Sequence, residues 1–435
     1  MNKLNDNQIS NYKKTNRKLF IFYKILANDL LFYYTISYLF LSNVKGLSTA
    51  QIVFAESFYP LFKLFFQIPC TILIQKIGKR NSLLIANFNI AIYLFFVLNL
   101  STTLFLILAN VFCAIGFVIK GIAESNFLYD SLEETENIKE DFSKIEGKAS
   151  SCFFFIDAIT ALATGFIYLI NPYLPIMISL LAILCSLIIT FKFHEIPNNT
   201  QKVSQPHSTL KQIKEHTYDT YQGFKYIFKS PRLKALIFFN ALSVGLLILM
   251  VTLHRSLLDD LGVSSGYLGI IFALMGIVIS FSSSRSVFLH KKYRNKTLSL
   301  LGTLLVISII LTGLVTTIKL PAFLTYYLLL IMISITYIVK GPHYVLIKQY
   351  LNSFCDSNMR IKIYSANLLI EYLTTSSISM FCSLLLNNYS NSLTTLIIGL
   401  ISSILMIIIV KYMSTRVGLK PEEYSKRDIL FLELN

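Results

Sequence analysis

The sequence predicts an all-α membrane protein with twelve transmembrane helices in two six-helix bundles, and three observations lead to this fold class. Hydrophobic residues make up 54% of the 435 residues and charged residues only 14%, against roughly a quarter in soluble domains. The apolar residues form runs of about 20 residues, the length that crosses a bilayer as a helix. The basic residues lie in short segments between the runs, which is typical of membrane topology and not of a nucleic-acid-binding surface.

Twelve apolar runs are long enough to span a membrane. In chain order they cover residues 19–41, 49–74, 82–100, 103–123, 150–170, 174–191, 235–257, 266–288, 298–318, 322–345, 364–386 and 393–410. Leaving the central loop aside, the two tails and the alternate loops on one side carry 23 Lys and Arg residues, whereas the loops on the other side carry only Lys45 and Lys319. The positive-inside rule therefore predicts a multi-pass protein of the cell membrane with both termini in the cytoplasm.

The runs also predict the domain organisation. The expected parts are a cytoplasmic tail over 1–18, a six-helix bundle over 19–193, a cytoplasmic central loop over 194–233, a second six-helix bundle over 234–413 and a cytoplasmic tail over 414–435. Within the central loop, residues 210–228 read as an amphipathic helix on the membrane face, with an apolar side formed by Ile213, Tyr221, Phe224, Ile227 and Phe228. The basic loops 75–80 and 291–296 occupy corresponding places in the two halves, as expected of a transporter built from repeats.

Ionisable residues are distributed unevenly among the runs. The third, sixth, ninth and twelfth runs carry none, so we expect these four helices to face lipid and the other eight to surround an aqueous path. Candidates for the proton-coupling pathway lie deep within their spans and are Asp29, Glu56, Lys63, Asp157 and Glu371. Other ionisable residues lie near the cytoplasmic ends of their spans, and we expect their side chains to extend to the membrane surface; they are Lys24, Lys120, Arg285 and Lys340.

Two of the deep charges are expected to form an ion pair. The first two runs are joined by a short loop, which makes them adjacent antiparallel helices. Asp29 lies about 15 Å from one edge of its span and Lys63 about 21 Å from the opposite edge, which gives them similar depths. Facing one another, they would offset each other's loss of solvation.

Several short motifs resemble the major facilitator superfamily, and most closely its bacterial drug-and-metabolite-efflux-like branch. The residues that carry the resemblance are Gly46-Leu47-Ser48, Gln51-Ile52, Glu56, Ile68-Pro69, Lys76-Ile77-Gly78-Lys79-Arg80, Gly121-Ile122-Ala123-Glu124-Ser125 and Tyr129-Asp130. The resemblance implies a twelve-helix transporter with a cytoplasmic gate motif formed by Gln75, Lys76, Gly78, Lys79, Arg80, Glu124 and Asp130.

The chain departs from the family pattern at identifiable positions. Gln75 stands where the family has an Asp that locks the gate, and Thr71 stands where it has a Gly. The Arg-containing motif of proton-coupled drug antiporters is missing before Gly116. With the Asp replaced, Glu124 and Asp130 become alternative gate-locking groups. The short loop between the second and third runs also predicts a tight reversal, with Gly78 at positive φ.

The predicted function is secondary active export of a small amphipathic drug-like or metabolite substrate from a bacterial cytoplasm, by alternating access and driven by protons through Asp29 or Glu56. Two alternatives stay open: import of a sugar, nucleoside or other polar nutrient, and a membrane sensor or binding protein that does not transport. The chain lacks a nucleotide-binding loop, a nucleophile motif and a metal-ligand pair, which predicts a non-enzyme without metal or cofactor. The expected partners are the substrate, protons and the lipid bilayer, and the expected state is a monomer.

Overall fold

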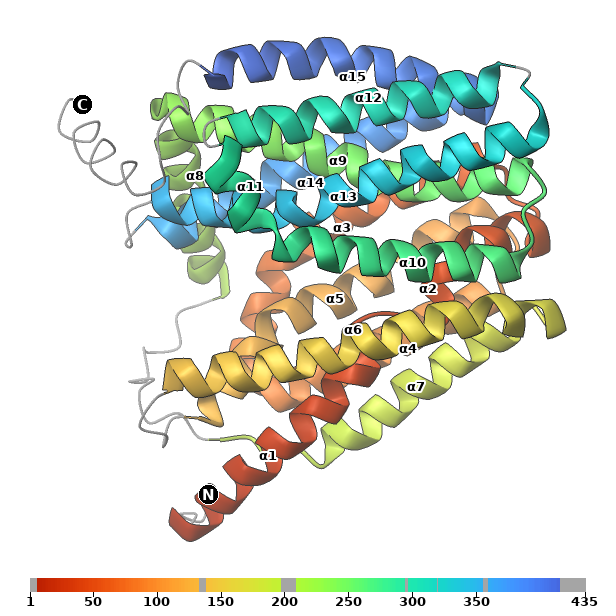
Figure 1. Ribbon diagram of the computed structural model, residues 1–435. Helices are drawn as coiled ribbons and strands as arrows, with labels where there is room; N and C mark the ends of the chain where they lie inside the picture. Colours follow the sequence, from red (N-terminus) through yellow and green to blue (C-terminus); the bar gives the residue numbers. More distant parts are fainter. Residues whose placement is uncertain are drawn as a thin grey trace. The chain divides into compact units, whose positions relative to one another are not determined.

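The computed structural model describes residues 6–132, 138–196, 209–293, 296–318, 320–354 and 359–414. Over these ranges the chain is α-helical and contains no β-strand (Figure 1). Within the described ranges, eleven helices are long and apolar enough to cross a membrane. The all-α membrane fold predicted from the apolar runs is therefore confirmed.

The helices of the first half follow the predicted runs, with one exception at the first span. They are α1 (Asp6–Ala27), α2 (Tyr33–Leu39), the π-helical η1 (Phe40–Val44), α3 (Thr49–Ile77), α4 (Lys79–Leu98), α5 (Thr103–Asp130), α6 (Ile138–Ile170) and α7 (Leu174–Phe191). The predicted single helix over 19–41 is wrong, because the chain leaves the helix at residues 28–32.

The second half begins with a helix that precedes its first span. The helices are α8 (Thr209–Lys229), α9 (Pro231–Asp260), α10 (Ser265–Ser284), α11 (Ser286–Tyr293), α12 (Thr297–Thr317), α13 (Ala322–Phe354), α14 (Arg360–Leu386) and α15 (Asn391–Ser414). Ser230 caps α9, since its hydroxyl accepts a hydrogen bond from the Leu233 N–H, and Pro231 occupies the first helical position, where its missing N–H costs nothing.

The helices group into two compact units. Unit 1 comprises Met1–Gly46, Leu61–Lys214 and Ser265–Ala273, and unit 2 comprises Leu47–Pro60, Glu215–Ser264 and Leu274–Asn435. In unit 2 the apolar core surrounds α9, which is buried along nearly its whole length by α12, α13, α14 and α15 (Figure 1). In unit 1 a core cluster is formed mainly by α1, α3, α4 and α5, together with Ala149 of α6 and Phe193 of the segment after α7.

The first part of α3 belongs to unit 2 through specific polar contacts. The Thr49 and Ser256 hydroxyls lie 3.2 Å apart, and the Ser383 hydroxyl donates a hydrogen bond to the Ala50 carbonyl at 2.9 Å. Val53 is buried in the unit 2 core. The start of α3 is therefore held by α9 and α14. The pattern of apolar runs in the sequence does not predict this packing.

The predicted orientation leads to a labelling experiment. We expect cysteines introduced at Lys79, Lys144 and Lys292 to be protected from a membrane-impermeant thiol reagent in intact cells, and a cysteine at Asp259 to react. The positions are suitable because they lie in or beside the charged segments between the apolar runs. Strong reaction at position 144 from outside the cell would contradict the topology.

Candidate functional site

The break in the first span places free backbone groups inside unit 1. Asn28 and Asp29 disfavour helix because their side chains compete for backbone hydrogen bonds, and the Asp29 carboxylate accepts the Leu30 N–H at 2.8 Å. Phe32 follows with φ 67°, which is uncommon for a residue other than glycine and marks a strained turn. The break thus lies at one of the predicted pathway residues.

Polar side chains from two other helices satisfy the carbonyls that the break leaves free. The Lys120 ammonium, on α5, donates a hydrogen bond to the Ala27 carbonyl. The Ser179 hydroxyl, on α7, donates one to the Leu31 carbonyl. Non-helical backbone at membrane depth requires such partners. Lys120 is buried and points inward, so the prediction that it extends to the membrane surface is wrong.

Further charges of unit 1 lie around the break. The charge of Asp29 acts on both Lys120 and Asp157. The Lys63 and Lys120 ammonium groups lie 6.0 Å and 5.5 Å from the centre of the same aromatic ring, that of Phe117. Unit 1 therefore brings Asp29, Lys63 and Asp157, all predicted from the sequence, into one neighbourhood with Lys120. The ion pair between Asp29 and Lys63 stays a prediction.

A second charged cluster in unit 1 is centred on Glu124. Its carboxylate accepts hydrogen bonds from the Lys24 ammonium at 2.8 Å and from the Tyr23 hydroxyl at 3.0 Å. Lys24 also pairs with Glu146 at 3.3 Å. Lys24 is buried, so its predicted extension to the membrane surface is wrong as well. Glu124 thus binds α1 to α5.

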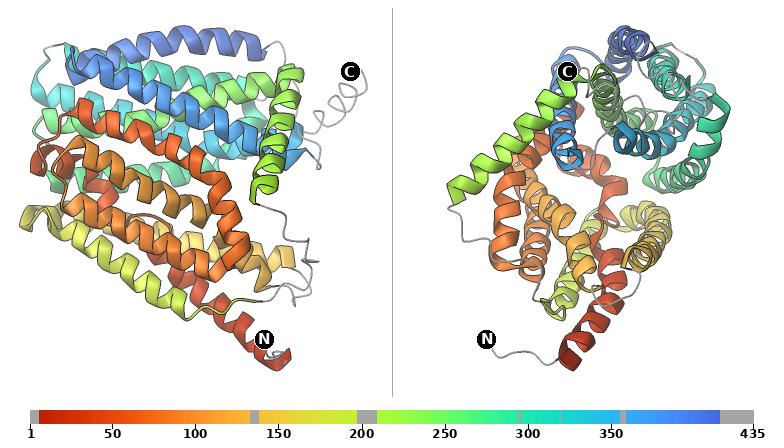
Figure 2. Two further views of the ribbon diagram at one scale, coloured as in Figure 1. Left: turned by 180° about the vertical axis from the view of Figure 1, so that it is seen from behind. Right: turned by 90° about the vertical axis from the view of Figure 1, so that its left-hand side faces the viewer.

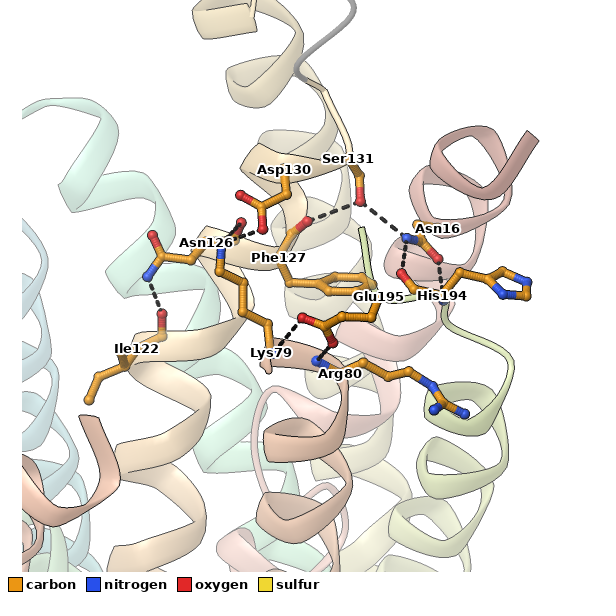
Figure 3. Close-up of polar contacts among 10 residues, drawn as sticks. All are labelled: Asn16, Lys79, Arg80, Ile122, Asn126, Phe127, Asp130, Ser131, His194 and Glu195. Atoms are coloured by element: carbon orange, nitrogen blue, oxygen red, sulfur yellow. Dashed lines mark hydrogen bonds and ion pairs between the residues drawn. The ribbon is translucent and has the colours of Figure 1, made fainter. Parts of the chain in front are cut away.

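The gate motif lies where α3 turns into α4, and Gly78 alone joins the two helices. Its φ is 85°, which confirms the predicted positive φ. The Lys79 ammonium forms an ion pair with the Asp130 carboxylate, at the end of α5 (Figure 3). Gln75 and Lys76 are exposed. Asp130, one of the two suggested alternatives to the missing Asp, therefore bonds the motif directly.

Glu195 also belongs to this site, although no motif in the sequence predicts it. Its carboxylate accepts the backbone N–H of Lys79 at 2.8 Å and that of Arg80 at 2.7 Å, and so caps the start of α4 (Figure 3). Helix N-termini favour such an anion because their N–H groups are free and their dipole is positive. The Arg80 guanidinium donates to the Phe191 carbonyl at 2.8 Å. These contacts together hold the segment after α7 against α4.

The same segment is also held by α1. The Asn16 amide donates to the His194 carbonyl at 2.8 Å, and the His194 N–H donates to the Asn16 side-chain oxygen at 2.9 Å. The His194 ring stacks on Tyr12 with a centroid separation of 3.9 Å. Burial, with a smaller contribution from Arg80, lowers the pKa of His194 below its ordinary value. One short segment therefore connects α1, α4 and α7.

Glu195→Ala should lower the stability of unit 1 by about 1 kcal/mol, the usual cost of losing a side-chain cap. The measurement is the midpoint of thermal unfolding of the purified chain in detergent. Glu140→Ala is the control, because Glu140 forms an exposed ion pair with Lys144 on the same helix, and such pairs contribute little. Equal midpoints for the two variants would contradict the capping role of Glu195.

Unit 2 holds the remaining two predicted pathway residues in separate places. The Glu371 carboxylate accepts a hydrogen bond from the Asn240 amide at 3.0 Å, and the Asn240 oxygen lies 3.1 Å from the His343 ring. The Glu56 carboxylate accepts one from the Thr252 hydroxyl at 2.8 Å. Glu371 and Glu56 therefore each bond to α9, about three turns apart along it by the helix repeat.

The seventh span carries two ionisable residues that were not chosen as candidates. His254 and Arg255 are both buried on α9, and Arg255 acts electrostatically on Glu56. Their presence inside the apolar run 235–257 was the available signal. Among the described residues, no three His, Cys, Asp or Glu side chains are placed to hold a metal ion.

The apolar spans and their internal charges define a multi-pass membrane protein of the transporter class. The sequence matches the profile of the Major Facilitator Superfamily over residues 19–376, and the chain belongs to this superfamily. No curated protein sequence matches the chain.

Solved structures share the fold at low sequence identity. The nucleoside transporter NupG is 13% identical with a TM-score of 0.69, and the match covers 94% of this chain and 100% of that one. A bacterial homolog of the human lysosomal transporter Spinster, inward-facing and unoccupied, is 13% identical with a TM-score of 0.62 and coverages of 99% and 97%. A D-xylose-proton symporter is 13% identical with a TM-score of 0.59 and coverages of 94% and 98%.

Proposed function

We propose that this member of the superfamily is a secondary active transporter that exports a small amphipathic drug-like molecule or metabolite from a bacterial cytoplasm, using the proton gradient. The observation that carries the proposal is the broken first span with Asp29 at its break. Transporters bind substrates and coupling ions where a span is interrupted and backbone groups are freed. A carboxylate there, with lysines and an aromatic ring beside it, suits an amphipathic substrate that carries charge.

Proton coupling is assigned to Asp29 or Glu56, since burial among apolar helices makes the charged form of a carboxylate costly, so that such a group binds and releases its proton nearer to neutral pH than an exposed carboxylate does. Asp157 and Glu371 extend the pathway, and Lys63 balances the negative charge near Asp29. The direction of transport rests on the resemblance to the efflux-like branch. The chain would act as a monomer in the cell membrane with both termini in the cytoplasm, and with bundles over 19–193 and 234–413 rocking about the substrate.

The test is a flux assay with the full chain in proteoliposomes and an imposed pH gradient, run on a panel of amphipathic and polar compounds. We expect one or more amphipathic cations or zwitterions to accumulate against a gradient, and a protonophore to abolish the accumulation. The reconstituted chain can insert into the vesicle membrane in both orientations. The fraction of each orientation is therefore measured with a single-cysteine label, and the direction of transport is assigned from it. Absence of flux with every compound would support the sensor alternative and contradict transport.

A second function, import of a polar nutrient, is favoured by one observation in unit 2. Asn240, Asn367, His343 and Glu371 form a buried network of amide, imidazole and carboxylate groups, with 3.5 Å between the two Asn side chains. Groups of this kind recognise sugars and nucleobases through hydrogen bonds, and transporters of a nucleoside and of D-xylose share the fold. Accumulation of nucleosides or sugars, with no flux of amphipathic compounds, would establish import.

A further inference from the structure

Helix α8 packs on unit 2 through one of its faces. Gly223 lies so close to α14 that a Cβ added there would stand 2.2 Å from the Lys362 carbonyl oxygen. Ile227, one turn further, is only 1% exposed and belongs to the unit 2 core. Asp219, one turn before, forms an ion pair with the Lys362 ammonium at 2.9 Å. Residues spaced by four thus define the docked face of α8.

The opposite face of α8 carries exposed aromatic and basic side chains. Tyr218, Tyr221 and Phe228 are 59%, 61% and 54% exposed, and Lys225 and Lys229 are exposed beside them. The spacings of three and four residues place these five side chains along one side of the helix, and we call them the α8 stripe. The predicted apolar side of this helix is therefore divided, because Ile227 is buried whereas Tyr221 and Phe228 are not; the side chain of Ile213 lies outside the described part.

The stripe continues onto the outer surface of a membrane span. The Phe228 ring meets the Phe238 ring edge to face, with a centroid separation of 6.3 Å. Phe238 is 40% exposed and lies on α9, one of the apolar spans. Figure 2 shows α8 running across the ends of the unit 2 spans, which is the direction of the membrane plane. The stripe therefore continues to Phe238, an exposed residue near the start of the otherwise buried α9.

We infer that the α8 stripe binds the anionic phospholipid headgroups of the adjoining leaflet. Tyrosine and phenylalanine side chains enter the boundary between headgroups and acyl chains, and lysine side chains between them remain at the level of the phosphates. Juxtamembrane lysines attract anionic lipids in preference to zwitterionic ones. The docked face of α8 packs on α14, which carries Glu371. Lipid headgroups bound to the stripe would therefore influence the position of α14.

The experiment uses the absence of tryptophan from the chain. Tyr221→Trp introduces one fluorophore into the stripe of the full-length protein, which is reconstituted in vesicles containing either brominated phosphatidylglycerol or brominated phosphatidylcholine at equal mole fraction. We expect brominated phosphatidylglycerol to quench the emission of the introduced tryptophan, because its ring lies at the interface, and brominated phosphatidylcholine to quench it much less. Glu215→Trp, which is exposed on α8 outside the stripe, is the control and should respond to aqueous acrylamide instead.

The charge requirement is tested in the same protein. Adding Lys225→Gln and Lys229→Gln should remove the difference between the two brominated lipids, whereas the exposed pair Lys291→Gln and Lys292→Gln, with the same change in net charge, should preserve it. Equal quenching by both lipids before these substitutions would overturn the headgroup preference. Quenching of the stripe fluorophore by acrylamide and by neither lipid would overturn the membrane contact. Should Tyr221→Trp fail to fold, Phe228→Trp provides the same measurement.

Discussion

Replacing Gly78 with valine should reduce transport at least about tenfold while the protein still reaches the membrane. Gly78 is the single residue between α3 and α4, and its φ of 85° with ψ of 167° lies in a region that is essentially restricted to glycine, where any other residue is strained by about 1–3 kcal/mol. A Cβ there would also lie 2.8 Å from the Glu195 carboxyl carbon, so the cap on α4 would have to move. The measurements are flux of the substrate found in the compound panel and the unfolding midpoint in detergent.

Gly46 supplies the matched control for this substitution. Its φ is 69°, but no atom lies within 4 Å of the Cβ position, so Gly46→Val introduces the backbone strain without the collision. We expect Gly46→Val to lower the unfolding midpoint with a smaller loss of flux. Full activity of Gly78→Val would show that neither the turn nor the cap governs the motion of unit 1.

The spans were predictable because each is a long apolar run, and a bilayer demands such runs whatever the tertiary contacts. The break in the first span was not predictable, because the run over 19–41 is mostly apolar and helices tolerate a few polar residues such as Asn28 and Asp29. Its position is set by partners on other helices, Lys120 and Ser179, which bond the freed carbonyls. Lys120 and Ser179 lie far along the chain from the carbonyls that they bond, so the sequence alone does not identify them as partners.

Some residues of the candidate site could likewise be predicted from the sequence, and others could not. Asp29, Lys63 and Asp157 were found because charges inside apolar runs are costly and conspicuous. Lys24 and Lys120 were misassigned because depth along a span does not say whether a carboxylate or carbonyl lies nearby. Glu195 was missed because it caps a helix more than a hundred residues away in the chain, and only the fold brings its carboxylate to the backbone N–H groups at the start of α4.

The second large expected effect concerns the substitution of two charged residues near the helix break, Asp29 and Lys63. We expect Asp29→Asn and Lys63→Met each to impair folding and transport, because removing one member of the predicted ion pair leaves an uncompensated charge, which costs about 3–5 kcal/mol where the pair is fully buried. Both residues are half-buried, which places the expected cost at the lower end. The double substitution should recover the unfolding midpoint better than either single one. Glu140→Gln, on the exposed pair with Lys144, should leave the midpoint unchanged.

The double variant also separates coupling from structure. If Asp29 carries the coupled proton, the double variant should insert and bind substrate but not accumulate it against a gradient, whereas a purely structural pair would let it transport almost normally. Asp29 interacts electrostatically with Asp157, so the pH at which accumulation is half-maximal should shift in Asp157→Asn only when Asp29 is the coupling group. Full stability and activity of both single variants would show that Asp29 and Lys63 do not meet. The coupling carboxylate would then be Glu56, which is hydrogen-bonded to Thr252 at 2.8 Å and influenced by Arg255 on α9.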